Sequence, residues 1–263
     1  MAATAKLSVE GLGVSFGNAR TGETLSVIDD ISFAVREREF VAIVGPSGCG
    51  KTTLLHCLAG LHAATRGRIL CNGAAIAPGG HALAMVFQSP TLLPWRTVAD
   101  NIAYGLMLQK RYDDGARGRV AALVDLVGLG GFARHFPHEL SGGMQQRVNL
   151  ARALAVEPEI LLMDEPFAAL DAQTRESMQS ELLRIWDTDR KTVVFITHQI
   201  DEAVYLADRV VVLQARPSRV RADVAIALDR PRDPRIKRSP AFNDYVDRIS
   251  DLVMSSGATD RQP

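Results

Sequence analysis

The first part of the chain alternates apolar and polar side chains in the manner of β-strands. Residues 7–9, 14–16 and 31–35 are short runs of this kind. Residues 40–44 are apolar throughout, which predicts a strand that is buried on both faces and lies centrally in a parallel sheet. Two more strands are expected at residues 68–71 and 82–87, and Asn72-Gly73 after the first of them indicates a hairpin turn.

The pattern changes after residue 88 to the spacing of amphipathic helices. In residues 118–129, for example, Val120, Leu123, Val124 and Val127 fall on one face. Strands and helices alternate again from about residue 157, and this order is typical of a parallel α/β sheet. The expected helices are residues 101–109, 118–129, 144–156, 171–186 and 201–207, and the later strands are residues 160–163, 192–196 and 209–213.

These patterns predict three regions. Residues 1–88 and 157–228 form an α/β core, and residues 89–156 form a helical subdomain inserted in it. Residues 229–263 are expected to be a linker, rich in charge and proline up to residue 238, followed by a helix that Ser239-Pro240 begins. The apolar face of that helix consists of Phe242, Tyr245, Val246, Ile249 and Val253. This face indicates that the helix docks on the core, and the alternative is a regulatory or partner contact.

A glycine-rich turn follows the apolar strand at residues 40–44. Its sequence is Gly45-Pro46-Ser47-Gly48-Cys49-Gly50-Lys51-Thr52, and helix-forming residues begin at Thr53. Strand, glycine-rich turn and helix together are the layout of a phosphate-binding loop, because glycines let backbone N–H groups converge on an anion at a helix N-terminus. Lys51 is then expected to reach the β- and γ-phosphates of a nucleotide, and the Thr52 hydroxyl to bind Mg²⁺. The alternative is an ordinary glycine-rich turn before a helix.

Four polar residues lie where expected strands end. Asp164 and Glu165 follow a buried strand, where Asp164 is expected to hold Mg²⁺ through a water molecule and Glu165 to polarise an attacking water. Gln88 is expected to bind Mg²⁺ through its carbonyl and to orient water through its amide, and His198 to hydrogen-bond the γ-phosphate. If each of these four residues is considered alone, the alternative is that it is an ordinary capping or surface residue without a role in catalysis.

A second anion-binding turn is predicted within the helical subdomain. In Leu140-Ser141-Gly142-Gly143-Met144-Gln145-Gln146-Arg147, a hydroxyl, free backbone N–H groups and a helix dipole converge on one point. The chain thus contains two half-sites for the same anion.

The ordered set of phosphate loop, Gln88, this second turn, Asp164-Glu165 and His198 resembles the ATP-binding subunit of ABC transporters over nearly the whole chain. The resemblance implies a P-loop NTPase fold, with a RecA-like parallel sheet core, an antiparallel β subdomain and a helical signature subdomain. It also implies ATP and Mg²⁺ as cofactors and ATP hydrolysis coupled to transport. Asp171 is similar to the family's dimer-contacting loop, and Phe16 stands where the family stacks an aromatic ring on adenine, the alternative being an ordinary strand aromatic.

In this family two subunits associate head to tail, so each ATP would lie between one chain's phosphate loop and its partner's Ser141, Gly142, Gly143 and Gln145. Further segments resemble those of the nitrate, sulfonate and taurine importer group. They include Leu92-Leu93-Pro94-Trp95-Arg96-Thr97-Val98 and Phe136-Pro137-His138-Glu139-Leu140. Gln199 and Arg38 depart from the pattern, standing where Asp and Gly are usual, and Arg38 predicts slight strain in its turn.

The resemblance implies membrane permease subunits as partners, docking near Leu92, Leu93 and Trp95. The alternative is that Trp95 packs inside the helical subdomain. A solute-binding protein outside the cell would act indirectly. The expected location is the cytoplasmic face of the inner membrane, where the chain would be held peripherally through the permease.

Composition narrows the choice of function. The 263 residues include 30 basic and 30 acidic side chains, so no net charge draws the protein to nucleic acid. No apolar run approaches the roughly 20 residues that span a bilayer, and the first residues lack an export pattern. A soluble ABC-type ATPase acting on nucleic acid or the ribosome and a small-molecule kinase are the competing classes.

The three cysteines lack metal-ligand spacing, which indicates reduced thiols in the cytosol: Cys49, Cys57 and Cys71. Cys49 lies inside the phosphate loop beside Lys51. Backbone amides and this cation are expected to lower its pKa and make it reactive.

Overall fold

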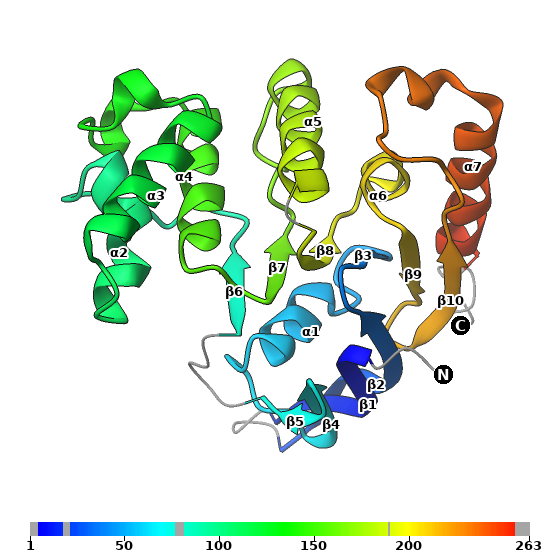
Figure 1. The fold of residues 1–263 in the computed structure, drawn as a ribbon. Helices are drawn as coiled ribbons and strands as arrows, with labels where there is room; N and C mark the ends of the chain where they lie inside the picture. Colours follow the sequence, from blue (N-terminus) through cyan, green and yellow to red (C-terminus); the bar gives the residue numbers. More distant parts are fainter. Residues whose placement is uncertain (1–4, 18–21, 77–81, 189, 256–263) are drawn as a thin grey trace. The chain divides into compact units, whose positions relative to one another are not determined.

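The computed structural model describes residues 5–17, 22–76, 82–188 and 190–255 (Figure 1). The chain divides into two compact units, of which the first is made of Met1–Gly80 and Trp186–Pro263 and the second of His81–Ile185. The three-region division predicted from the sequence, with limits at residues 89, 157 and 229, stays a prediction. In the part of the chain that the structure describes, no helix is both long and apolar enough to cross a membrane.

An antiparallel sheet lies in the first unit, with strand order β2-β1-β4-β5. The runs at residues 7–9 and 14–16 belong to one long strand, which continues through register shifts between Val9 and Val14. Asn72 and Gly73 both have positive φ, 51° and 78°, and join β4 to β5 in the expected hairpin. The strands are β1 (Ala5–Gly17), β2 (Thr24–Arg36), β4 (Arg66–Cys71) and β5 (Ala74–Ala75).

The first unit also contains parallel strands, with β3 (Phe40–Val44) between two neighbours. All residues of β3 are buried, which confirms the prediction of a central strand. Its parallel neighbours are β8 (Thr192–Ile196) and β9 (Arg209–Leu213), at the predicted positions. β10 (Val220–Ala225), antiparallel to β9, was not predicted from the sequence, although apolar and charged side chains alternate regularly along it.

The first unit also contains the helices α1 (Lys51–Leu58), α6 (Ile200–Leu206) and α7 (Pro240–Met254). As expected, the Ser239 hydroxyl begins α7 by accepting the N–H of Phe242 at 3.2 Å. Phe242 and Ile249 are buried, and the Tyr245 hydroxyl accepts the N–H of Ala227 at 3.1 Å. The helix therefore docks on its own unit, as its apolar face indicates.

The prediction that residues 229–238 form a linker is wrong. Arg232 is 5% exposed, and its Nη1 donates to the carbonyls of Val204, Tyr205 and Ala207 at the end of α6. Burial and the nearby Arg230 lower the pKa of Arg232 to about 10. Arg230 itself pairs with Asp208 at 2.7 Å. Charge and proline suggested a solvated segment, but here the arginines satisfy the carbonyls that a helix end leaves unpaired.

The second unit holds a helical cluster and two paired strands. Buried residues of α2, α3 and α4 form one apolar core, including Ile102, Val120 and Val148. α3 begins earlier than the sequence predicted because Asp113 caps it, accepting the N–H of Ala116 at 2.8 Å. The elements are β6 (Leu83–Val86), α2 (Val98–Leu108), α3 (Asp114–Leu126), α4 (Gly142–Ala155) and β7 (Ile160–Asp164), and α5 (Ala172–Thr188) starts here. Short 3-10 turns lie at Gly130–Phe132 and Pro137–Glu139, and another at Pro234–Arg238 in the first unit.

Candidate nucleotide site

The phosphate loop (residues 45–52) connects β3 to α1 in the first unit. Gly48 and Gly50 have φ of 70° and 102°, a region that favours glycine. At Gly50 a side chain would also collide with Val27, because a Cβ there would lie 2.9 Å from its Cγ1. The Gly50 carbonyl accepts the N–H of Leu54 at 2.8 Å and so starts the helix directly after the turn. The loop thus has the strand–turn–helix context that the sequence predicted.

Lys51 is 7% exposed and points back into this loop. Its Nζ donates to the carbonyls of Gly45 and Pro46 at 2.8 and 2.9 Å, and both acceptors are neutral. Among the residues that the structure describes, no carboxylate forms an ion pair with this ammonium group. A buried cation in such a setting is stabilised by a nearby anion. The loop therefore fits a phosphate group, which would supply that charge.

The turn that precedes β3 contains the departure from the family pattern at Arg38. Arg38 has φ of 61°, a left-handed conformation in which a residue with a Cβ is strained, so the expected strain is present. Its N–H donates to Thr192 Oγ1 at 3.0 Å, which ties this turn to the start of β8.

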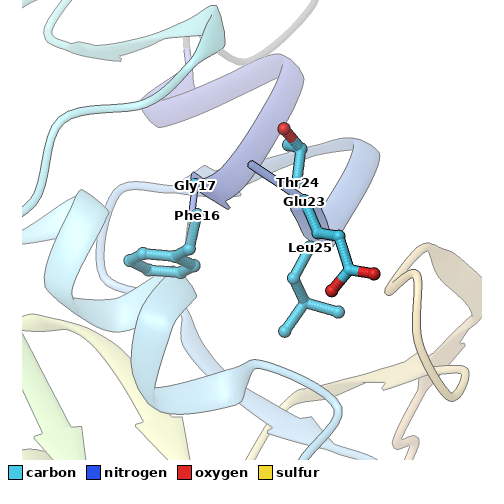
Figure 2. Close-up of a pocket in the computed structure, with 5 residues that line it drawn as sticks. All are labelled: Phe16, Gly17, Glu23, Thr24 and Leu25. Carbon is cyan, nitrogen blue, oxygen red and sulfur yellow. The ribbon is translucent and has the colours of Figure 1, made fainter. Parts of the chain in front are cut away.

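Phe16 lies near the end of β1 and is 41% exposed. Its ring stacks on His62, with centroids 4.9 Å apart and planes inclined by 28°. A cavity of about 670 Å³ is lined by Phe16, Gly17, Glu23, Thr24 and Leu25, and Figure 2 shows the Phe16 ring beside Leu25 there. The exposed ring beside a cavity suits stacking of a nucleobase, and adenine binding by Phe16 stays a prediction.

His198 is exposed and directly follows β8 and Thr197. The turn that carries it is fixed by Thr197, whose Oγ1 donates to Glu202 at 2.6 Å and accepts the N–H of Gln199 at 3.0 Å. Gln199 is the N-cap residue of α6, but its side chain makes no capping hydrogen bond. Asp, the usual residue at this position in the family pattern, is a preferred N-cap residue.

In the second unit, Gln88, Asp164 and Glu165 lie at one edge of a strand pair. β6 and β7 run parallel, so the residues that follow them meet at their carboxyl ends. The Gln88 amide nitrogen lies 3.5 Å from a Glu165 carboxylate oxygen. Asp164 ends β7 and is 5% exposed, whereas Glu165 turns the chain with φ of 42°. The structure thus brings together three of the four polar residues that the sequence placed at strand ends, whereas His198 belongs to the first unit.

The signature turn (Ser141, Gly142 and Gly143) opens α4 in the second unit. Ser141 caps the helix by accepting the N–H of Met144 at 3.3 Å, and space is open around Gly142. A Cβ on Gly143 would lie 2.8 Å from Thr174 of α5, so glycine permits this close approach. The first turn of α4 therefore presents backbone N–H groups and a positive dipole end, as predicted.

Two predicted binding residues beside the signature turn also make local bonds. The Gln145 amide donates to the carbonyls of Pro137 and Leu140 at 2.9 and 3.3 Å, which holds the chain that leads into the turn. Asp171 accepts the N–H of Thr174 at 3.0 Å, and hydrogen bonds from Thr174 lower the pKa of its carboxyl. Their contacts with nucleotide stay predictions.

The expected site residues fall into one group in each unit. Phe16, the phosphate loop with Thr53, and His198 belong to the first unit. Gln88, Asp164, Glu165, the signature turn and Asp171 belong to the second. Arg216 was not predicted: its Nε donates to the Gly48 carbonyl at 2.6 Å, but it lies in a turn that carries no sequence motif.

The prediction of a reactive Cys49 with a lowered pKa is wrong. The thiol is 1% exposed, and its burial raises its pKa more than the charge of Lys51 lowers it. The sequence places the thiol beside a cation, but it does not reveal that the side chain turns away from solvent.

We therefore expect iodoacetamide to modify the half-buried Cys71 well before Cys49 or Cys57 in the folded protein. Burial raises the pKa of Cys57 to about 11, so this thiol is protected as well. Peptide mass mapping at successive times measures the order of labelling, and all three thiols should react alike in guanidinium. Labelling of Cys49 at the rate of an exposed thiol would contradict the burial argument.

Comparison with known proteins agrees with this arrangement. The model of the ABC transporter family matches residues 28–168. The chain is 50% identical to an uncharacterised ABC transporter ATP-binding protein of Methanocaldococcus jannaschii, over 94% of this chain and 91% of that protein. It is 46% identical to the taurine import ATP-binding protein TauB of Rhizobium johnstonii, over 95% of this chain and 97% of TauB.

A Bacillus cereus protein named as an aliphatic sulfonates import ATP-binding protein is 40% identical, over 92% of this chain and 94% of that protein. Among solved structures, a dimeric ATP-binding cassette in a post-hydrolysis state with ADP and phosphate superposes with a TM-score of 0.74. It is 29% identical and covers 85% of this chain and 100% of its own length. With these relatives and with the phosphate loop, signature turn and strand-end carboxylates in place, the chain belongs to the ABC transporter family, as one of its ATP-hydrolysing subunits.

Proposed function

We propose that this chain energises the import of a small anion, similar to a sulfonate, taurine or nitrate, by binding and hydrolysing ATP as a head-to-tail homodimer. The observation that carries the proposal is the presence of two glycine-rich helix starts, at Lys51 and at the signature turn, which suit the binding of an anion. The names of relatives at 40% and 46% identity support sulfonate or taurine import. A solved relative at 29% identity is a dimer with ADP and phosphate.

In the proposed reaction, the phosphate loop and Lys51 bind the β- and γ-phosphates. Glu165 accepts a proton from the attacking water, and Gln88 and His198 orient that water and the γ-phosphate. Oxygen ligands from Thr52, Gln88 and Asp164, the last through water, suit Mg²⁺, which would offset phosphate charge when bound. The signature turn of the partner subunit closes the site over the γ-phosphate.

We propose that permease subunits bind at Leu92, Leu93 and Trp95. Trp95 is 71% exposed, so the alternative that it packs inside the helical subdomain is wrong. Leu92 packs partly against the helical core, and the N–H of Leu93 donates a hydrogen bond to Asn101 Oδ1 at 2.8 Å. These contacts fix the backbone just before Trp95. Through such a contact the subunit would sit peripherally on the cytoplasmic face of the inner membrane, coupled indirectly to an external solute-binding protein.

No observation favours the competing function on nucleic acid or the ribosome. The formal charge is zero, and phosphate-backbone binding depends on an excess of basic side chains.

The dimer is tested with Ser141→Arg, combined with Glu165→Gln so that bound ATP persists. We expect ATP binding to be retained and dimerisation to be lost, because a bulky arginine at the exposed start of α4 would obstruct the partner's nucleotide and block only the contribution in trans. Light scattering after size exclusion measures the mass with and without MgATP. Ser255→Arg, at the exposed end of α7, serves as the matched control and should still dimerise. A monomeric Glu165→Gln parent at every concentration would overturn the proposed dimer.

The cargo is tested by adding taurine, an alkanesulfonate or nitrate separately to the subunit assembled with its permease and solute-binding protein. Stimulation of ATP hydrolysis by one of these anions identifies the solute, whereas no stimulation by any of them would reject the proposed class.

A further inference from the structure

Helix α4 carries polar side chains that hold the loop joining β6 to α2. This Gln88 loop (residues 87–97) contains Gln88 near its start and Trp95 near its end. Asn149, fully buried on α4, donates its amide to the Phe87 carbonyl at 3.2 Å. The residue directly before Gln88 is therefore fixed to the helix that the signature turn opens.

Arg152, one turn further along α4, makes the larger part of this contact. Its Nη1 donates to the Thr91 carbonyl at 2.9 Å, and its Nη2 to the Pro90 carbonyl at 2.9 Å and the Thr91 hydroxyl at 3.2 Å. Nη2 also reaches the Asn149 amide oxygen at 2.8 Å, which orients Asn149 toward Phe87. A planar guanidinium can serve several acceptors in fixed directions, as a lysine cannot.

The backbone held by Arg152 is in an unfavourable conformation. Thr91 has φ of 44°, and a β-branched residue in this region is strained. The side chain and the carbonyl of this same residue are both acceptors for Arg152. The clamp (Asn149 and Arg152) therefore holds a loop conformation that the local sequence does not favour.

We propose that Arg152, acting with Asn149, is a positioning residue that makes the Gln88 loop and the signature helix move as one body. A displacement of Trp95 by a partner would then be transmitted to Gln88 and to the signature turn together. The clamp is defined by contacts within the second unit, whereas its effect on turnover rests on the proposed function. Arg152 itself touches neither nucleotide nor water in this scheme.

The clamp is tested first on the loop itself, by the fluorescence of Trp95. The chain has 2 tryptophans, and Trp186 is only 2% exposed, so the iodide-quenched part of the emission reports on Trp95. In Arg152→Met we expect the anisotropy of this component to decay faster than in the wild type. Arg117→Met is the matched control: Arg117 is also in the second unit, on α3, but it pairs with Asp114 at 2.6 Å, outside the Gln88 loop. Equal anisotropy in the Arg152→Met and wild-type proteins would overturn the clamp.

The second measurement is the steady-state hydrolysis of MgATP. In Arg152→Met we expect kcat to fall about tenfold, the effect of roughly 1.4 kcal/mol on the barrier, with KM changed less than about twofold. Arg152→Lys, which retains a cation and part of the bonding, should recover part of the loss in kcat. A tenfold loss of kcat in Arg117→Met as well, or a lower urea midpoint for Arg152→Met without any change in Trp95 anisotropy, would show a structural role and overturn the proposal.

The two measurements separate this inference from the proposed function. If the wild-type chain hydrolysed no ATP, the proposed function would fail, while the anisotropy would still decide whether Arg152 holds the loop. A faster anisotropy decay with unchanged kcat would overturn the link between the clamp and turnover.

Discussion

Glu165→Gln is expected to lower the turnover of ATP by about 10²–10⁴-fold, the usual contribution of a general base, while nucleotide binding persists. Glutamine has the same size but cannot take a proton from water. The Gln88 amide lies 3.5 Å from the Glu165 carboxylate, so the replacement changes the chemistry at the strand ends more than the packing. Phosphate release at saturating MgATP measures turnover, and equilibrium dialysis measures binding.

The matched control for this variant is Glu157→Gln. Glu157 is also a glutamate with positive φ, 53°, in the second unit, but its carboxylate pairs with Arg119 at 2.6 Å away from the strand ends. Its replacement should leave turnover within about twofold of the wild type, because surface ion pairs contribute little. Wild-type turnover in Glu165→Gln would remove Glu165 from the role of general base.

Lys51→Ala is expected to raise the Kd for ATP by at least about tenfold, since hydrogen bonds to charged groups contribute roughly 1.5–3 kcal/mol. The folded protein should remain stable, because the loop carbonyls of Gly45 and Pro46 that accept from Lys51 can be bound by water instead. Titration with a fluorescent ATP analogue measures the affinity. Lys110→Ala, at an exposed lysine after α2, is the control and should bind as the wild type does. Unchanged affinity in Lys51→Ala would contradict the assignment of the phosphate loop.

Elements with strong local patterns could be predicted from the sequence. The apolar strands β3, β8 and β9 lie where expected. A short apolar run between turns has to be buried, and it is most often a strand inside a sheet. Arg232 is the opposite case. It contributes to the fold by hydrogen bonds to carbonyls at the end of α6, which is distant along the chain. Composition alone could not distinguish a buried capping arginine from a solvated one.

The candidate site shows the same division between local and distant information. The cap of Ser141 and the turn at Gly50 are local consequences of residue type and were predictable. The contact of Arg152 with Thr91 depends on how a helix and a loop pack, so no motif indicated it. The pKa of Cys49 departs from the sequence-based prediction for a related reason, because the exposure of the thiol is set by the surrounding fold rather than by its neighbour Lys51.

The order of strands in the first unit has a consequence for how the protein is made. β3 emerges early during translation, yet its hydrogen-bonding neighbours β8 and β9 are synthesised only after the whole of the second unit. The arginine that closes the end of α6 emerges later still. A nascent chain therefore exposes an apolar, unpaired strand for much of its synthesis, and such strands are prone to aggregate. Production of this subunit should depend on chaperones, or on slow translation at low temperature, more than its final stability would suggest.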